Sequence, residues 1–305
     1  MIQDILRPDY RAHAVLVEPA RPKSELWRLC AGLVLAVCLL LFVVQFFASM
    51  YLQLFFIDQQ SLESLEEIDS GNTPVSAYFL LLQIALLTPV ISMVAFVLHG
   101  RRLNSLIGPK ELAVTQFVGV LVVQIALAAI VFVLPPYGFA EGAVQPNLNF
   151  GLWLVLLPLS IVVILLQCAA EEIVFRGYSQ QQLAARFKNT AIWLIIPSAL
   201  FGFLHYMPET AGENAFAIAV WAAIFGALMA DLTARAGTLG PAIAIHLVNN
   251  MIALLVFAPA DDMYGLALYT MPFGLSNEDA VRTWLMIDLF YMGVSWLAAR
   301  LVLQR

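Results

Sequence analysis

Long runs of apolar residues, separated by short polar segments, dominate the pattern of this chain. Most of the runs have about the 20 residues that a helix needs to cross a membrane, and the fifth and seventh are shorter. The pattern predicts eight transmembrane helices, at residues 27–50, 76–99, 112–134, 150–170, 191–207, 214–232, 241–258 and 283–303.

The composition supports a membrane location. Hydrophobic residues make up 62% of the chain and charged residues 12%, whereas soluble domains have about 25% charged residues. We therefore expect an all-α, multi-pass protein surrounded by membrane lipids in a cell membrane, such as a bacterial inner membrane. The basic residues are too scattered for nucleic-acid binding. The cysteines have no pairing or metal-ligand spacing, and all lie in apolar runs: Cys30, Cys38 and Cys168.

The positions of the basic residues predict the orientation. All but one of the 15 lysines and arginines lie in the tails and in alternate loops, and the exception is Arg282. Loops rich in Lys and Arg face the cytoplasm. Both termini are therefore predicted to be cytoplasmic.

Outside the helices, three segments have distinct characters. Residues 1–26 are polar and are predicted to form a cytoplasmic, partly disordered tail, followed by one membrane domain over 27–305. Residues 177–190 are amphipathic and are expected to lie along the cytoplasmic interface as a short helix after the fourth span. The loop 51–75 is acidic and is expected on the external side, with no role that the residues indicate.

Charged groups at the end of the fourth apolar run are the first candidates for chemistry. A charge at the centre of a membrane helix costs about 2.5–3.5 kcal/mol, so such groups are usually paired or functional. On a helix, Glu172 and Arg176 are four residues apart and can form an ion pair. Glu171 points about 100° away and is the carboxylate left over.

Two histidines and an amide inside later helices complete a candidate site. His246 and Asn250 share one helix face and could direct hydrogen-bond donors at a developing oxyanion. Glu171 with His205 could hold and deprotonate a water molecule. No serine or cysteine has the context of a nucleophile, so water is the expected attacking species in a hydrolase.

The residues also leave room for a metal ion and for roles of a few further polar side chains. Glu171, His205 and His246 are ligand types of a catalytic zinc site, although the His-Glu-x-x-His motif is lacking. Zinc therefore stays an option. Other polar residues near or in apolar runs are weaker candidates: Gln167, one turn before the carboxylates, as a hydrogen-bonding residue, and Asp288 and the Asp231–Arg235 pair as structural groups.

These motifs, in this order, resemble the CPBP family of CAAX-type prenyl endopeptidases and bacteriocin-processing or immunity proteins. The resemblance covers residues 160–257 and rests on three patterns: Glu171-Glu172-x-x-x-Arg176, Phe201-x-x-x-His205 and His246-x-x-x-Asn250. It implies that Glu171 activates the water with help from His205, that His246 and Asn250 face the oxyanion, and that Glu172 and Arg176 fix the geometry.

The expected function is an intramembrane endopeptidase that cleaves a peptide or lipidated protein substrate near the cytoplasmic leaflet. Because the family includes immunity proteins, a non-catalytic immunity or scaffold protein of the same fold is one alternative. A proton-coupled transporter that uses Glu171 and the histidines as a relay is another.

The predicted depths of the site residues disagree. If the fifth helix begins near residue 191, then His205 lies about 21 Å from its cytoplasmic end at 1.5 Å per residue. Glu171, by contrast, would lie near the cytoplasmic surface. The hypothesis that reconciles them places Glu171 at a water-filled cavity, with residues 177–190 folded back over it.

Overall fold

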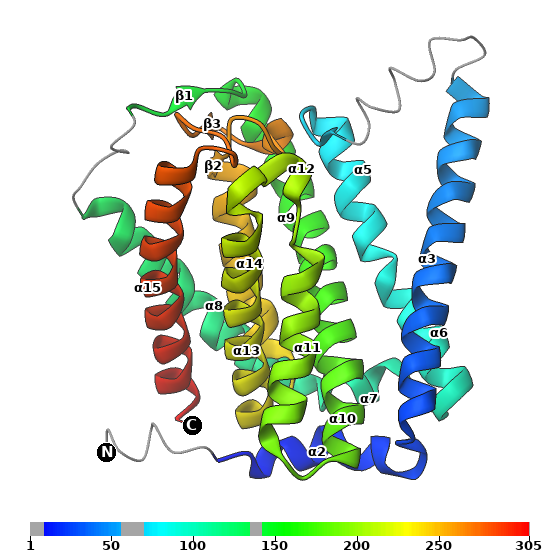
Figure 1. The fold of residues 1–305 in the computed structure, drawn as a ribbon. Coiled ribbons are helices and arrows are strands. Elements are labelled where there is room, and N and C mark those ends of the chain that lie inside the picture. Colours follow the sequence, from blue (N-terminus) through cyan, green and yellow to red (C-terminus); the bar gives the residue numbers. More distant parts are fainter. Residues whose placement is uncertain (1–8, 56–69, 135–141, 305) are drawn as a thin grey trace.

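The chain forms a bundle of helices, shown in Figure 1. This computed structural model describes residues 9–55, 70–134 and 142–304. Six helical stretches are long and apolar enough to cross a membrane. They comprise α3 (Leu26–Phe55), α5 and α6 (Pro74–Ala85 and Leu87–His99), α8 (Lys110–Val133), α9 to α10 (Phe150–Arg186), α12 to α13 (Pro208–Ala211 and Ala215–Ala236) and α15 (Glu278–Leu303). The all-α membrane fold is thus confirmed.

Two shorter apolar helices stand where the fifth and seventh spans were predicted. They are α11 (Thr190–Leu204) and α14 (Gly240–Met251), the latter prolonged by a π-helical turn, Ile252–Val256. Helix α14 is buried along most of its length and packs on α8, α9 and α13. These two helices are too short to count as spans by length alone, so the total of eight crossings stays a prediction.

The second predicted helix is interrupted. It consists of α5 and α6, which meet at Leu86. Pro89, near the start of α6, has no N–H to donate to the carbonyl of Ala85, which explains a break at this point. A capping box between Thr73 and Ser76 fixes the start of α5.

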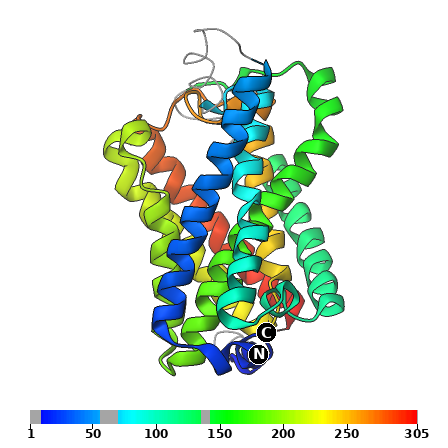
Figure 2. The same ribbon diagram turned by 90° about the vertical axis from the view of Figure 1, so that its right-hand side faces the viewer.

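The N-terminal segment differs from the expected tail. Residues 9–23 form three short helices, Arg11–His13, α2 (Ala14–Val17) and Glu18–Lys23, at the same end of the bundle as the end of α15 (Figures 1 and 2). Leu16 is fully buried in this segment. The His13 ring packs at a tilt against the Trp193 ring, with the ring centroids 4.8 Å apart, and its burial lowers the pKa of His13 to about 4. Apolar side chains between the charged residues explain why the segment packs.

Residues 177–190 also differ from the expectation of an interfacial helix. A short helix does follow α9, but α10 (Gln180–Arg186) continues α9 through a π-helical stretch, Ile173–Ser179. Two of its buried glutamines find backbone partners: Gln180 donates to the Ala230 carbonyl at 3.0 Å and Gln181 to that of Leu106 at 2.8 Å. The polar face of this segment therefore contacts protein.

Three two-residue strands close the opposite end of the bundle. Their order is β1 (Gln145–Pro146), β3 (Tyr269–Thr270), β2 (Phe257–Ala258), with β1 antiparallel and β2 parallel to β3. The loops expected on the external side thus meet at one end, next to the short helix Tyr264–Leu266. Most of the acidic loop 51–75 lies outside the described residues.

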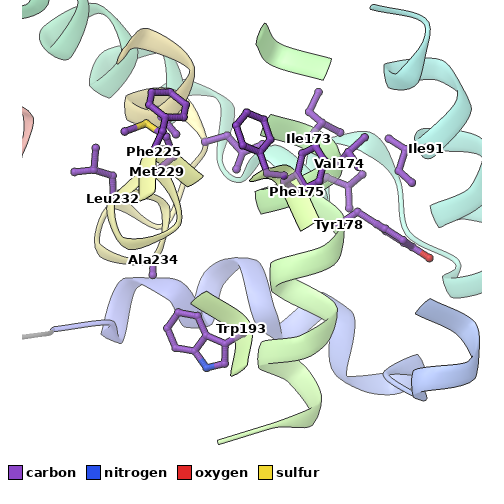
Figure 3. Packing of buried hydrophobic residues seen from close by; sticks show 14 of the residues in the cluster. Ile91, Ile173, Val174, Phe175, Tyr178, Trp193, Phe225, Met229, Leu232 and Ala234 are labelled. Carbon is purple, nitrogen blue, oxygen red and sulfur yellow. The ribbon is translucent and has the colours of Figure 1, made fainter. Parts of the chain in front are cut away.

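The main hydrophobic cluster surrounds the π-helical stretch. Figure 3 shows its side chains, including Phe175 and Tyr178, between those of α13 and Ile91 of α6. Helix α7 (Leu103–Ile107) packs beside the same stretch, and the Cβ that Gly177 lacks would lie 3.2 Å from the Leu106 carbonyl. This core fixes the end of α9, where the candidate site begins.

Candidate active site

Glu171 and His205 lie at matching levels of an antiparallel helix pair. The helix from Phe150 runs without a break to Arg186, and α11 returns from Thr190. Glu171 is 15 residues before Arg186 and His205 is 15 residues after Thr190. At 1.5 Å per residue each lies about 22 Å from the connecting turn. Phe175 and Phe201 lie one helical turn closer to the connecting loop than Glu171 and His205. Their rings are in edge contact, with centroids 5.1 Å apart.

This geometry corrects the depth expected for Glu171. The sequence suggested that the helix ended near residue 170, because charged residues follow. The structure instead continues the helix for fifteen residues beyond Glu171, through a π-helical stretch of the kind often found at functional sites. Residues 177–190 therefore extend the helix away from Glu171 and do not fold back over it.

A buried ion pair holds one of the histidines. Arg176 donates to Oε1 of Glu172 at 3.1 Å, and both side chains are at most 1% exposed. The same oxygen lies 2.9 Å from Nδ1 of His246. Because a carboxylate can only accept, Nδ1 of His246 carries the proton of this hydrogen bond. The pair therefore sets both the orientation and the tautomer of the imidazole.

The other nitrogen of His246 faces the second carboxylate. Nε2 lies 3.5 Å from Oε2 of Glu171, whose side chain is 13% exposed. From the motif resemblance, His246 was expected beside Asn250 and His205 beside Glu171. The structure brings His246 to Glu171 directly. One imidazole thus lies between two adjacent carboxylates, one fully buried and one partly exposed.

An amide pair occupies the remaining side of Glu171. Gln167 donates from Nε2 to Oε1 of Glu171 at 2.8 Å, and its Oε1 accepts from Nδ2 of Asn250 at 3.0 Å. Asn250, one turn after His246 on α14, therefore reaches Glu171 through Gln167. The spacing of His246 and Asn250 predicted that the two side chains share one helix face. This face does point at the end of α9.

His205 joins this group through an aromatic ring. It lies just after the last residue of α11, and its Nδ1 is bonded to the Phe201 carbonyl at 2.8 Å. The Phe201 ring is 4.5 Å from the His205 ring and 6.1 Å from that of His246. The Arg176 guanidinium lies over the same ring at 4.9 Å. Within the described part of the chain, the side-chain contacts of His205 are thus with Phe201.

The proposed zinc ligands are not gathered as a metal would require. Among the residues that the structure describes, no three His, Cys, Asp or Glu side chains form a group that could hold a metal ion. Glu171 and His246 approach each other, but the other nitrogen of His246 is bonded to Glu172 and His205 is bonded to its own helix. Glu171, His205 and His246 are therefore not gathered into a preformed metal site in the part of the chain that the structure describes.

Comparison with known proteins is consistent with this arrangement. Residues 152–252, which contain all six candidate side chains, match the family model described as type II CAAX prenyl endopeptidase Rce1-like. This segment is an Rce1-like domain. The resemblance drawn from the three motifs is thereby confirmed. The family is one of proteases, and with the apolar helices it indicates a multi-pass membrane protein of a protease family.

A curated relative gives no information on the activity of the chain. The chain is 26% identical over 185 residues to the uncharacterized protein YyaK of Bacillus subtilis (strain 168). The match covers 59% of this chain and spans 59% of the length of that relative. No solved structure matches the chain.

Some contacts around the Rce1-like domain were underestimated from the sequence. Gln167 was only a weak candidate, although its position one turn before Glu171 on the same face was the available signal. Phe225 was missed, and its ring packs edge-on against His246 at 5.1 Å. An aromatic residue in an apolar helix carries no local signal for such a role. Asp288, expected to be structural, accepts a hydrogen bond from the Trp221 indole at 2.8 Å.

Proposed function

We propose that this protein is an intramembrane endopeptidase in which Glu171 activates a water molecule for attack on a peptide bond. The observation that carries the proposal is the pairing of Glu171 with an imidazole that a buried ion pair holds in one orientation. A carboxylate near a correctly oriented imidazole, partly exposed among buried groups, has the features of a general base.

In the proposed reaction, Glu171 takes a proton from water as the water oxygen bonds to the peptide carbonyl carbon. The carbonyl oxygen becomes an oxyanion, which the second N–H of the Asn250 amide stabilises. As the C–N bond breaks, the leaving nitrogen receives the proton held between Glu171 and Nε2 of His246. His205, beyond the Phe201 ring, is proposed to hold the water or the substrate with its Nε2. No step requires a serine or cysteine nucleophile.

We further propose that the substrate is a peptide or lipidated protein that enters from the membrane and reaches the site, about 22 Å from the connecting turn, from the cytoplasmic side. The end of the bundle that carries the N-terminal segment and the end of α15 is the proposed cytoplasmic end. The match to a family described as CAAX prenyl endopeptidases supports a CAAX-like substrate. Whether the substrate must carry a prenyl group is decided by comparing matched peptides with and without the lipid.

The experiment uses the full chain in lipid nanodiscs with such a peptide pair. We expect cleavage by the wild type and a loss of about 10²-fold or more in kcat for Asn250→Ala, typical of an oxyanion donor. Glu111→Gln, an exposed acid at the start of α8, is the matched surface control. Full activity of Asn250→Ala, or solute uptake coupled to protons without any cleavage, would contradict the proposal.

A further inference from the structure

Gln167 connects the two polar ends of the candidate site. It lies on α9 one turn before Glu171 and is 4% exposed. Its Nε2 donates to Oε1 of Glu171, and its Oε1 accepts from Asn250 and, at 3.3 Å, from the thiol of Cys168. Helices α9 and α14, which are otherwise joined here by the contacts of His246, are thus linked a second time.

The two partners of Gln167 determine how its amide is oriented. The Glu171 carboxylate has only acceptors, and the Nδ2 group of Asn250 has only donors. The NH₂ of Gln167 must therefore face Glu171 and its oxygen must face Asn250. A glutamate in this place would present acceptors to both, and a methionine of similar length would present neither a donor nor a strong acceptor.

This bridge makes the two oxygens of Glu171 unequal. Oε1 accepts the hydrogen bond from Gln167, whereas Oε2 faces Nε2 of His246 at 3.5 Å. The bridge also engages one of the two N–H groups of Asn250, so this side chain cannot rotate without breaking its bond to Gln167.

We propose that Gln167 is a positioning residue of the reaction: it selects Oε2 of Glu171 as the basic oxygen and holds the Asn250 amide toward the oxyanion. This inference rests on the function proposed above. In this role, the Gln167 side chain connects the base, Glu171 on α9, to the oxyanion donor, Asn250 on α14. A hydrogen bond to a carboxylate is stronger than one between neutral groups, so it can fix a side chain in a site of this kind.

The test compares Gln167→Met and Gln167→Glu with Gln180→Met, measuring kcat, KM and the pH profile of peptide cleavage in nanodiscs. Gln180 is a matched control, because it is a buried glutamine on the same continuous helix that bonds the Ala230 carbonyl away from the site. For Gln167→Met we expect kcat to fall about 10–100-fold with little change in KM, as for residues that orient catalytic groups. Gln180→Met should keep the wild-type kcat per folded molecule.

Gln167→Glu gives the sharper readout. It places a second carboxylate beside Glu171, so one of the two holds a proton to higher pH than a single carboxylate would. We expect the acidic limb of the kcat profile to move to higher pH. A role confined to packing would lower the amount of folded protein and leave the profile unchanged.

The outcomes separate this inference from the proposed function. If Glu171→Gln abolishes cleavage while both Gln167 variants keep the wild-type kcat and pH profile, then the role of Gln167 is refuted and the function stands. If Glu171→Gln cleaves as well as the wild type, then the proposed function fails first. A fall in kcat for Gln167→Met together with the shifted profile of Gln167→Glu supports the inference.

Discussion

Two carboxylate–arginine pairs with the same i,i+4 spacing have opposite surroundings in this protein. In the pair on α13, both oxygens of Asp231 are engaged: Oδ1 accepts from Tyr10 at 2.8 Å, and Oδ2 accepts from Arg235 at 2.7 Å and from Trp296 at 3.0 Å. In the pair after α9, Oε1 of Glu172 accepts from both Arg176 and His246. Oε2 of Glu172 and Nη2 of Arg176 have no hydrogen-bond partner among the described residues.

The difference shows that the spacing alone does not indicate a role. The Asp231 pair joins the N-terminal segment, α13 and α15, and both carboxylate oxygens of Asp231 accept hydrogen bonds in these contacts. The Glu172 pair is more deeply buried and lies beside a further carboxylate, Glu171, which shares its histidine. Under the proposed function, the pair beside an additional acid and an imidazole serves the reaction, whereas the pair whose carboxylate oxygens are both bonded serves the structure. The following changes test this contrast.

Arg176→Met should have the largest effect. It leaves the buried Glu172 carboxylate without its cation, and breaking a buried ion pair costs about 3–5 kcal/mol. We expect the free energy of unfolding to fall by this amount in denaturant titrations of the purified protein. Arg21→Met removes an exposed pair with Glu18 and should cost about 1 kcal/mol or less. Equal effects of the two variants would mean that the Glu172 pair is not buried as described.

Asp231→Asn should cost less stability and leave the reaction intact. It weakens the bonds from Tyr10, Arg235 and Trp296 without removing the side chain, and a buried polar group left unsatisfied costs about 1–3 kcal/mol. The unfolding midpoint should drop, while kcat per folded molecule stays at the wild-type value. A loss of kcat equal to that caused by substitutions at Glu172 would erase the distinction between the two pairs.

Lowering the pH should destabilise the structural side through His13. His13, which packs beside the Asp231 group, has its pKa lowered by burial from 6.5 to about 4. Between these values the unfolded chain binds a proton that the folded chain does not. Stability is therefore fully present above pH 6.5 and falls as the pH drops toward 4, by about 1.4 kcal/mol per pH unit at most.

His13→Gln provides the control for this pH effect. The variant cannot titrate in this range, so its unfolding midpoint should fall less steeply between pH 6.5 and 4 than that of the wild type. Identical slopes for the two proteins would show that the N-terminal segment does not bury His13.

Tyr10→Phe should have the smallest effect. It removes one hydrogen bond to Asp231 and keeps the ring, which is in edge contact with Trp193 at 5.2 Å. The expected cost is about 0.5–1.5 kcal/mol. Hydrogen exchange of residues 9–23 should become faster while that of α9 stays unchanged. Unaltered exchange in the N-terminal segment would argue against its attachment through Asp231.

Much of the fold could be predicted because membrane helices have a strong local signal. All eight apolar runs correspond to helices, and most of their boundaries lie close to the predicted ones; the fourth helix is the exception, because it continues to Arg186. The signal failed where polar residues are buried by tertiary contacts. The sequence of α10 is amphipathic and predicts a solvent-facing polar side. Gln180 and Gln181 instead bond backbone carbonyls of α13 and α7, which no local pattern reveals.

The sequence predicted which residues belong to the candidate site, but not which of them contact each other. The charged residues and histidines were found because ionisable groups are rare in apolar helices. Which histidine faces Glu171 depends on the continuation of α9 into α10, and this depends on the packing of the π-helical stretch around Gly177. The prediction therefore placed His205 beside Glu171, whereas the structure places His246 there.

The most direct test of the central claim compares two neighbouring carboxylates by the same substitution. The kcat for peptide cleavage is measured for Glu171→Gln and Glu172→Gln in nanodiscs, corrected for the folded fraction. The account predicts a loss of about 10²-fold or more for Glu171→Gln, because a general base is removed. For Glu172→Gln it predicts reduced but measurable turnover, because the amide oxygen can still accept from His246. Wild-type turnover by Glu171→Gln would contradict the claim that this carboxylate activates the water.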